Sequence, residues 1–145
     1  MNDKRQELLQ ILIKNSTQVF HDMNKEQEFP FGNMILRRQQ MMIMFFLSEN
    51  KGIAPVKEIA KFLQVTPGAV TQFVDGLVKK KLVEREGSKT DGRSTNIKLS
   101  LTTKAKFDDF KKSYLTNVSR TFSGLSEKEL EQFIKFIGKM KVPRC

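Results

Sequence analysis

The chain has 145 residues, which suits one domain or one small domain with helical extensions, and its 39% apolar content excludes a disordered polypeptide. A net charge of +10 indicates a polyanionic partner such as nucleic acid or an anionic membrane surface, or else simply a soluble basic protein. The excess is local: the net charge is zero over residues 1–50, +7 over 51–112 (14 basic, 7 acidic) and +3 over 113–145. A basic surface in the middle of the chain fits binding to nucleic acid.

Cellular location is indicated by three features of the sequence. The one cysteine, Cys145, allows no disulfide within the chain, which fits a reducing compartment. The N-terminus "MNDKRQELLQ" lacks the apolar core of a signal peptide. The longest apolar run, "MMIMFFL", is far shorter than the roughly 20 residues of a membrane span. We therefore expect a cytoplasmic protein with no membrane partner.

The first expected element is a helix over residues 4–24. Apolar residues recur at helical spacing along a wide face, made of Leu8, Leu9, Leu12, Ile13, Val19, Phe20 and Met23. A helix with such a face needs a partner, either another part of the chain or a second copy. Pro30 and Gly32 then break the helical pattern, which predicts a loop.

A second helix is expected over residues 35–49. Its run "MMIMFFL" leaves no clean polar face, so the helix should be covered on more than one side. Gly52 ends it, and Ile53 can form a short strand. Pro55 suits the first turn of a third helix, whose buried stripe would be Val56, Ile59, Ala60 and Leu63.

A fourth helix is predicted by "TPGAVTQFVDGLVKKKL". Thr66 is a good N-cap and Pro67 a good first residue. Helical spacing predicts that four apolar side chains are buried: Val70, Val74, Leu77 and Val78. Because a tight turn joins it to the third helix, the pair is a candidate helix-turn-helix.

Two short strands should follow, "LVEREG" and "TNIKLSL", with Ile97, Leu99 and Leu101 on one face and the loop "SKTDGRS" between them. A helix-turn-helix followed by a β-hairpin is the order of elements in a winged helix. The sequence thus predicts a mainly α (α+β) fold, a winged helix-turn-helix domain with a two-strand wing.

The C-terminal part should form two more helices. Thr102 or Thr103 can cap the fifth, over roughly residues 103–122, and Gly124 ends it. Ser126 to Glu129, "SEKE", is a capping box for the last helix. Its apolar positions are Leu130, Phe133, Ile134, Ile137 and Met140.

Enzymatic function is excluded by the inventory of reactive residues. The one histidine, His21, has no Cys or Ser motif near it. No metal-ligand cluster, phosphate-binding glycine loop or nucleophile elbow is present, so we expect no cofactor. His21 is interpreted as a helix-surface or dimer-contact residue; a ligand contact or a pH-sensitive pair is the alternative.

Nucleic-acid contacts are predicted at the start of the fourth helix. The helix begins at Thr66 and Pro67, and the N–H groups of a helix N-terminus favour phosphate. Gly68 and Ala69 are small enough for close approach to a groove. Thr71, Gln72 and Asp75 face outward. Thr71 can bond a base or a phosphate, and Gln72 can bond the edge of adenine. The alternative is an ordinary exposed surface. Lys79, Lys80 and Lys81 similarly fit either a solvated helix end or contacts with phosphate.

The loop between the strands contains the strongest single candidate, Arg93. An arginine at a hairpin tip can enter the minor groove, and Asp91 two residues earlier can hold its guanidinium in place. The residues that complete this wing contact are Lys89, Ser94 and Lys98. The alternative is an exposed ion pair that contributes little.

The sequence resembles the MarR family of transcriptional regulators. The matching features are "VTPGAVTQFVDGLVKKKLVER", the wing "DGR" (the family's Asp-x-Arg), "LSLTTKA" and the closing "GLSEKELEQFIKFIGKM". The resemblance implies a homodimeric repressor or activator that binds pseudo-palindromic double-stranded DNA. Residues 1–34 and 103–145 would form the helical dimerisation region, and residues 35–102 the DNA-binding lobe.

The resemblance also implies a small aromatic effector that releases the DNA. The candidate pocket residues are His21, Met42, Phe45 and Phe46, although the last three are of a kind that more often belongs to a core. The sequence departs from the family pattern at Gly68, where a serine is frequent, and it lacks the N-terminal cysteine of oxidant-sensing members. The alternative function is a winged-helix protein-interaction module that docks an acidic partner without sequence-specific DNA binding.

Overall fold

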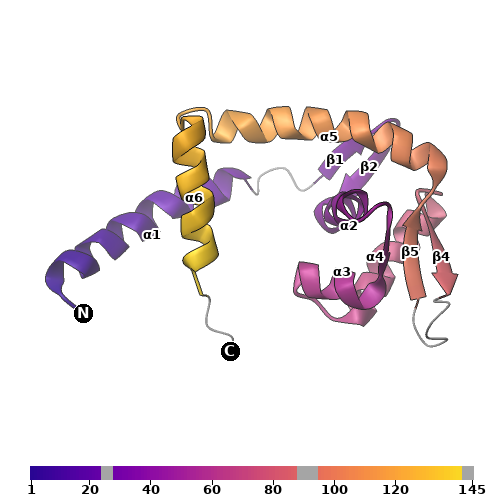
Figure 1. The fold of residues 1–145 in the computed structure, drawn as a ribbon, viewed down its shortest axis with the longest axis horizontal. Helices are drawn as coiled ribbons and strands as arrows, with labels where there is room; N and C mark the ends of the chain where they lie inside the picture. The colour runs from indigo at the N-terminus through magenta and orange to yellow at the C-terminus, as the bar shows by residue number, and fades with distance from the viewer. Residues whose placement is uncertain (24–27, 88–94, 142–145) are drawn as a thin grey trace. The chain divides into compact units, whose positions relative to one another are not determined.

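The computed structural model describes residues 1–23, 28–87 and 95–141. The chain divides into two compact units, Met1–Ser100 and Leu101–Cys145, whose elements are drawn in Figure 1. The first unit holds α1, α2, a helix-turn-helix and five short strands, and the second holds the two helices α5 and α6. The predicted mainly α fold with a winged helix is confirmed. Among the described residues, no helix combines the length and apolarity needed to cross a membrane.

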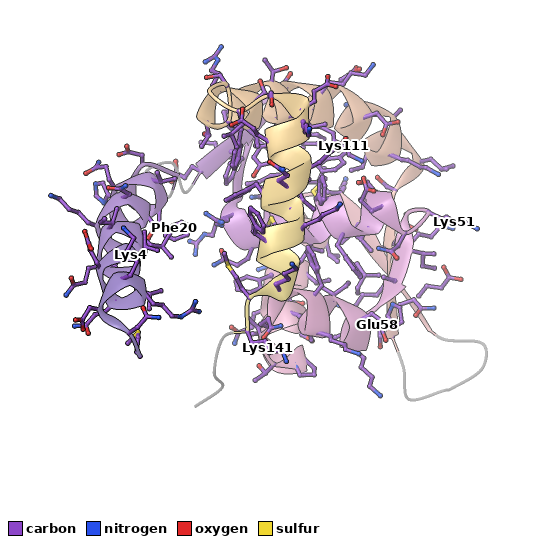
Figure 2. The ribbon with its side chains drawn as sticks, turned by 60° about the vertical axis from the view of Figure 1, so that its left-hand side comes forward. Lys4, Phe20, Lys51, Glu58, Lys111 and Lys141 are labelled. Atoms are coloured by element: carbon purple, nitrogen blue, oxygen red, sulfur yellow. The ribbon has the colours of Figure 1, made fainter. Side chains whose placement is uncertain are left out.

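Helix α1 spans Asp3–Met23, which confirms the predicted N-terminal helix. Its apolar side chains lie in the open: Phe20, labelled in Figure 2, is 59% exposed. Six others are between 37% and 64% exposed, namely Leu8, Leu9, Ile11, Leu12, Ile13 and Val19. An apolar helix face this wide is unfavourable in water. We therefore expect another protein surface to cover it.

Strands β1 (Glu28–Phe31) and β2 (Met34–Arg37) form an antiparallel hairpin where the sequence predicted a loop. Gly32 forms the turn with a left-handed φ of +60°. Pro30 pairs with Ile35, and this pair is the second one from the two-residue turn. In such a pair the backbone N–H and C=O groups point away from the partner strand. The missing N–H of Pro30 therefore breaks no bond of the ladder, so the proline is tolerated.

Helix α2 spans Arg38–Glu49, so it begins three residues later than predicted, because Met34–Arg37 is paired in β2. Five of its residues are buried, namely Gln40, Met41, Ile43, Met44 and Leu47. Met42, Phe45, Phe46 and Ser48 are half-buried, so this helix is indeed covered around much of its surface. It packs against α3 and α4 and against the strands β2 and β5.

The predicted helix-turn-helix is confirmed as α3 (Val56–Leu63) and α4 (Pro67–Lys79). Pro55 ends strand β3 (Ile53–Pro55) and directly precedes α3. Gln64, with a left-handed φ of +60°, ends α3 and turns the chain into α4. The side chains beneath this pair are fully buried at Ile59, Val70, Val74 and Leu77, whereas Val78 is half-buried.

Strands β4 (Val83–Gly87) and β5 (Thr95–Leu99) build the predicted wing, with β5 central in the sheet order β3-β5-β4. Ile97 and Leu99 are buried, as expected, but Leu101 is 84% exposed and begins α5. The prediction for Leu101 was wrong because the partner strands stop: Leu99 pairs with Val83, the first residue of β4. Beyond Leu99 there is no strand to pair with, and the chain turns into a helix.

The second unit consists of α5 (Leu101–Thr121) and α6 (Glu127–Lys139). Because α5 begins as soon as the strand ends, Thr103 lies inside its first turn and is 2% exposed, so it is not the predicted cap. Phe122 and Phe133 meet with ring centroids 5.8 Å apart. No residue of α6 is buried, and five of its side chains are between 36% and 61% exposed: Leu130, Phe133, Ile134, Phe136 and Ile137.

The capping box predicted for α6 is confirmed. The Ser126 hydroxyl accepts a hydrogen bond from the Glu129 N–H at 3.2 Å, and the Glu129 carboxylate accepts one from the Ser126 N–H at 3.0 Å. Hydrogen bonding of the carboxylate to the Ser126 backbone N–H, and secondarily to the Ser126 side chain, lowers the pKa of the Glu129 carboxyl below its ordinary value. The ionised carboxylate is therefore the form that stabilises the start of α6.

We expect acid to weaken the start of α6. Because the folded-state pKa of Glu129 is depressed, its contribution is fully present above the unfolded-state pKa and is lost as the pH falls through the folded-state pKa. Glu129→Gln should make stability in urea less dependent on pH over this acidic range, whereas Glu131→Gln on the same helix should not. An unchanged acid dependence in Glu129→Gln would contradict the assignment.

Candidate nucleic-acid interface

The start of α4 presents the residues predicted to contact DNA. The Thr66 hydroxyl accepts a hydrogen bond from the Ala69 N–H at 3.1 Å and fixes the first turn, with Pro67 as its first residue. Thr66, Pro67 and Gly68 are exposed, and Ala69 is half-buried. One turn later, Thr71 and Gln72 are exposed as well. The arrangement presents the positive end of the helix beside a small-residue surface and one long amide side chain.

A side chain that sequence reasoning missed attaches the wing to this helix. Arg85 of β4 forms an ion pair with Asp75 and donates a second hydrogen bond to the Thr71 carbonyl at 3.3 Å. Arg85 pairs with the buried Ile97 in the sheet register, so it points to the face that meets α4. Asp75 was predicted to face outward, and its carboxylate is 54% exposed. An exposed pair contributes little energy, but it fixes β4 on α4.

The opposite side of α4 is attached to the β1–β2 hairpin. The Lys80 ammonium donates a hydrogen bond to the Ile35 carbonyl at 2.7 Å. That carbonyl lies on the outer edge of β2, where the hairpin leaves it without a strand partner. Lys80 is half-buried, whereas Lys79 and Lys81 are exposed. The three lysines at this helix end therefore differ, and Lys80 has a structural contact.

The tip of the wing, with Lys89, Asp91, Arg93 and Ser94, lies outside the described residues. The last pair below it is Gly87 with Thr95. Lys98, also predicted to contact phosphate, is exposed on β5. It stands opposite Glu84 of β4, whose carboxylate reduces the positive potential of that face of the sheet.

The candidate effector-pocket residues lie on two helices. His21 is exposed in the last turn of α1, and Met42, Phe45 and Phe46 are half-buried on α2. The ring of Phe46 stacks on Phe62 of α3 with centroids 4.7 Å apart, and Phe62 is itself 40% exposed. These rings form an apolar surface that is neither fully core nor fully solvated. Within the described ranges, no group of three His, Cys, Asp or Glu residues could hold a metal ion.

A separate open depression of about 430 Å³ lies where α4 ends beside β4. The residues lining it are Val78, Lys81, Val83, Glu84 and Arg85. None of the predicted pocket residues belongs to it.

Residues 36–94 match a family model described as the MarR family. The HTH-type transcriptional repressor YetL of Bacillus subtilis (strain 168) is 28% identical over 120 residues, covering 81% of this chain and 71% of YetL. The S. aureus MepR–DNA complex is similar at 28% identity and a TM-score of 0.62, covering 72% of this chain and 77% of that one. AbsC from Streptomyces coelicolor, a MarR family transcriptional regulator, shares the fold at 20% identity, with a TM-score of 0.74 over 94% and 91% of the two chains.

Proposed function

The chain belongs to the MarR family of transcriptional regulators, and from this premise we propose that it acts as a homodimer that binds pseudo-palindromic double-stranded DNA. Members of this family are regulators and not enzymes. The observation that supports DNA binding most directly is the exposed start of α4, held by the Thr66 cap and presented by a helix-turn-helix. The similarity to MepR in its complex with DNA supports the same role.

In the proposed complex, α4 enters the major groove. Gln72 is suited to bond the N6/N7 edge of adenine, and Thr71 to bond a base or a phosphate. The helix start at Thr66, Pro67 and Gly68 would approach the sugar-phosphate backbone. Arg93 of the wing would enter the minor groove, with Asp91 holding it and with Lys89 and Ser94 beside it. The middle of the chain carries the excess of positive charge that such a complex needs.

The proposed dimer uses α1 and α6. Both helices present rows of exposed large apolar side chains, including Leu12 on α1 and Ile134 on α6. A second copy of the chain would cover these rows and form an interface of the same chemistry on both sides. Two DNA-binding lobes would then contact half-sites about one helical turn, roughly 34 Å, apart. We propose repression as the outcome, as in the relative YetL.

We further propose that a small aromatic ligand regulates binding. The half-buried surface of Met42, Phe45 and Phe46 has the chemistry to take an aromatic ring, with His21 as a polar contact. Such a ligand releases DNA only if it binds more tightly to a lobe separation that does not match the two half-sites.

Selection of bound sequences from a random duplex pool tests the proposal. We expect an enriched pseudo-palindrome whose half-sites are about one helical turn apart. Affinity for it should fall steeply with salt, because the contacts with phosphate release counterions. Enrichment of no sequence, together with salt-sensitive capture by an acidic protein surface, would instead support the protein-interaction module.

A further inference from the structure

Gln40 is a buried polar residue at the start of α2. It is 6% exposed, and its side-chain carbonyl accepts a hydrogen bond from the Arg37 N–H at 3.1 Å. Arg37 occupies the N-cap position of α2, where its guanidinium has no acceptor with which to cap the helix. The amide of Gln40 is therefore the group that satisfies this first turn, and it can move only by giving up that bond.

The other end of the Gln40 amide lies against the last turn of α4, at Gly76. A Cβ atom added at Gly76 would stand 2.5 Å from the Gln40 Nε2, well inside van der Waals contact. Gly76 lies within a regular helix and shows no positive φ, in contrast to Gly32 in the β1–β2 turn. The close approach of Gln40 therefore explains the glycine here, and backbone conformation does not.

Two sets of contacts hold α4, one along each border of its exposed face. The contact between Gln40 and Gly76 lies on the first border. Lys80, one turn after Gly76, donates its hydrogen bond to the Ile35 carbonyl, two residues before Arg37. Gly76 and Lys80 thus hold α4 against the junction of β2 and α2. On the other border, Asp75 is held by Arg85. Gln72 lies on the exposed strip between the borders, so its direction depends on both of them.

We propose that Gln40 is a positioning residue for DNA recognition. Its amide sets the spacing between the first turn of α2 and the last turn of α4, and so directs Gln72, one turn earlier on α4, toward the bases. The inference rests on the proposed DNA-binding function and adds a residue that touches no DNA. A displaced α4 would lose directed contacts with base edges while keeping the diffuse attraction to phosphate.

A double-mutant cycle on the full chain tests this role, with the selected operator and a random duplex as probes. Gly76→Ala should lower the ratio of operator affinity to random-duplex affinity at least about fivefold, as does the loss of one base contact. In the Gln40→Ala background, where the amide is gone, the same glycine substitution should change the ratio less than about twofold. Binding is measured at a temperature at which all variants are folded.

Gly124→Ala is the control, because it makes the same glycine-to-alanine change in the turn between α5 and α6, where an added Cβ meets nothing within 4 Å. It should leave the affinity ratio unchanged. An equal loss from Gly76→Ala in both backgrounds would overturn the proposal, since Gln40 would not transmit the effect. A lower melting temperature with an unchanged ratio would also overturn it, by showing a purely structural role.

Failure of the proposed function gives a different result. If the wild-type chain selects no sequence, DNA recognition itself is contradicted. The melting temperatures of the four proteins in the cycle then still measure the contact between Gln40 and Gly76. Gly76→Ala should lower the melting temperature in the wild-type background and raise it in the Gln40→Ala background, where the helix-favouring alanine fits.

Discussion

Replacing Ile134 with glutamate should turn the protein into a monomer and lower its operator affinity at least about 100-fold, which corresponds to roughly 2.7 kcal/mol. Ile134 is 61% exposed in the apolar row of α6. In the proposed dimer this row is covered by the second copy, and a carboxylate there would be buried without a partner. A monomer presents one recognition helix to a two-part site, so it loses the second half of the contacts. Sedimentation at micromolar concentration gives the oligomeric state, and titration of the selected operator gives the affinity.

Gln132→Glu is the matched control for this change. It adds the same side chain to the same helix, two residues away and outside the row of large apolar side chains. This variant should stay dimeric and bind the operator nearly as the wild type does. A wild-type protein that sediments as a monomer would defeat the dimer proposal, as would an Ile134→Glu variant that remains a dimer.

Arg93→Ala should weaken operator binding by about 1–3 kcal/mol, or roughly 5- to 150-fold. The arginine belongs to the most basic part of the sequence and lies between β4 and β5 in the chain, and in the proposed complex its guanidinium enters a narrow minor groove. The loss should be larger on operators with an A·T-rich segment at the wing than on those with G·C pairs there. Binding titrations against both operators measure it.

Asp91→Ala tests whether the carboxylate orients Arg93 for DNA binding or stabilises the fold. Removing the carboxylate should lower operator affinity without changing the melting temperature, because an ion pair at a hairpin tip is exposed. A marked loss of thermal stability would instead make the pair structural. If Arg93→Ala binds duplex DNA as tightly as the wild type does, the proposed groove contact is wrong.

The elements that the sequence predicted best are those whose signals are local. Thr66 caps α4 and Ser126 caps α6 through hydrogen bonds that span three residues. The β1–β2 hairpin was missed because Pro30 and Gly32 were interpreted only as breakers of a helix. Pairing through Phe31 and Met34 makes the same two residues compatible with a strand and a turn. The two-residue turn Gly32–Asn33 is itself a local hairpin signal that also sets the register, so this element was open to prediction from the sequence.

The candidate site was predicted only in part. Helical spacing was enough to place Thr71 and Gln72 on the exposed side of α4. It could not show that Asp75 pairs with Arg85, ten residues away, or that Lys80 bonds Ile35, 45 residues away. Such contacts depend on how elements pack. They fix the position of α4 against the neighbouring strands. Helical spacing along the sequence cannot predict that position.

The bond between Lys80 and Ile35 also bears on how the protein presents its cations to a polyanion. In the sequence, Lys79, Lys80 and Lys81 look like one block of three equivalent charges. Lys80, however, has its ammonium engaged by a backbone carbonyl at 2.7 Å and is half-buried. That bond uses one of the three N–H donors of the ammonium, so Lys80 keeps its charge while its position is fixed beside the hairpin. The three charges of this helix end are therefore not equivalent: Lys79 and Lys81 are free to move toward a phosphate, whereas Lys80 acts only from the place where the hairpin edge holds it.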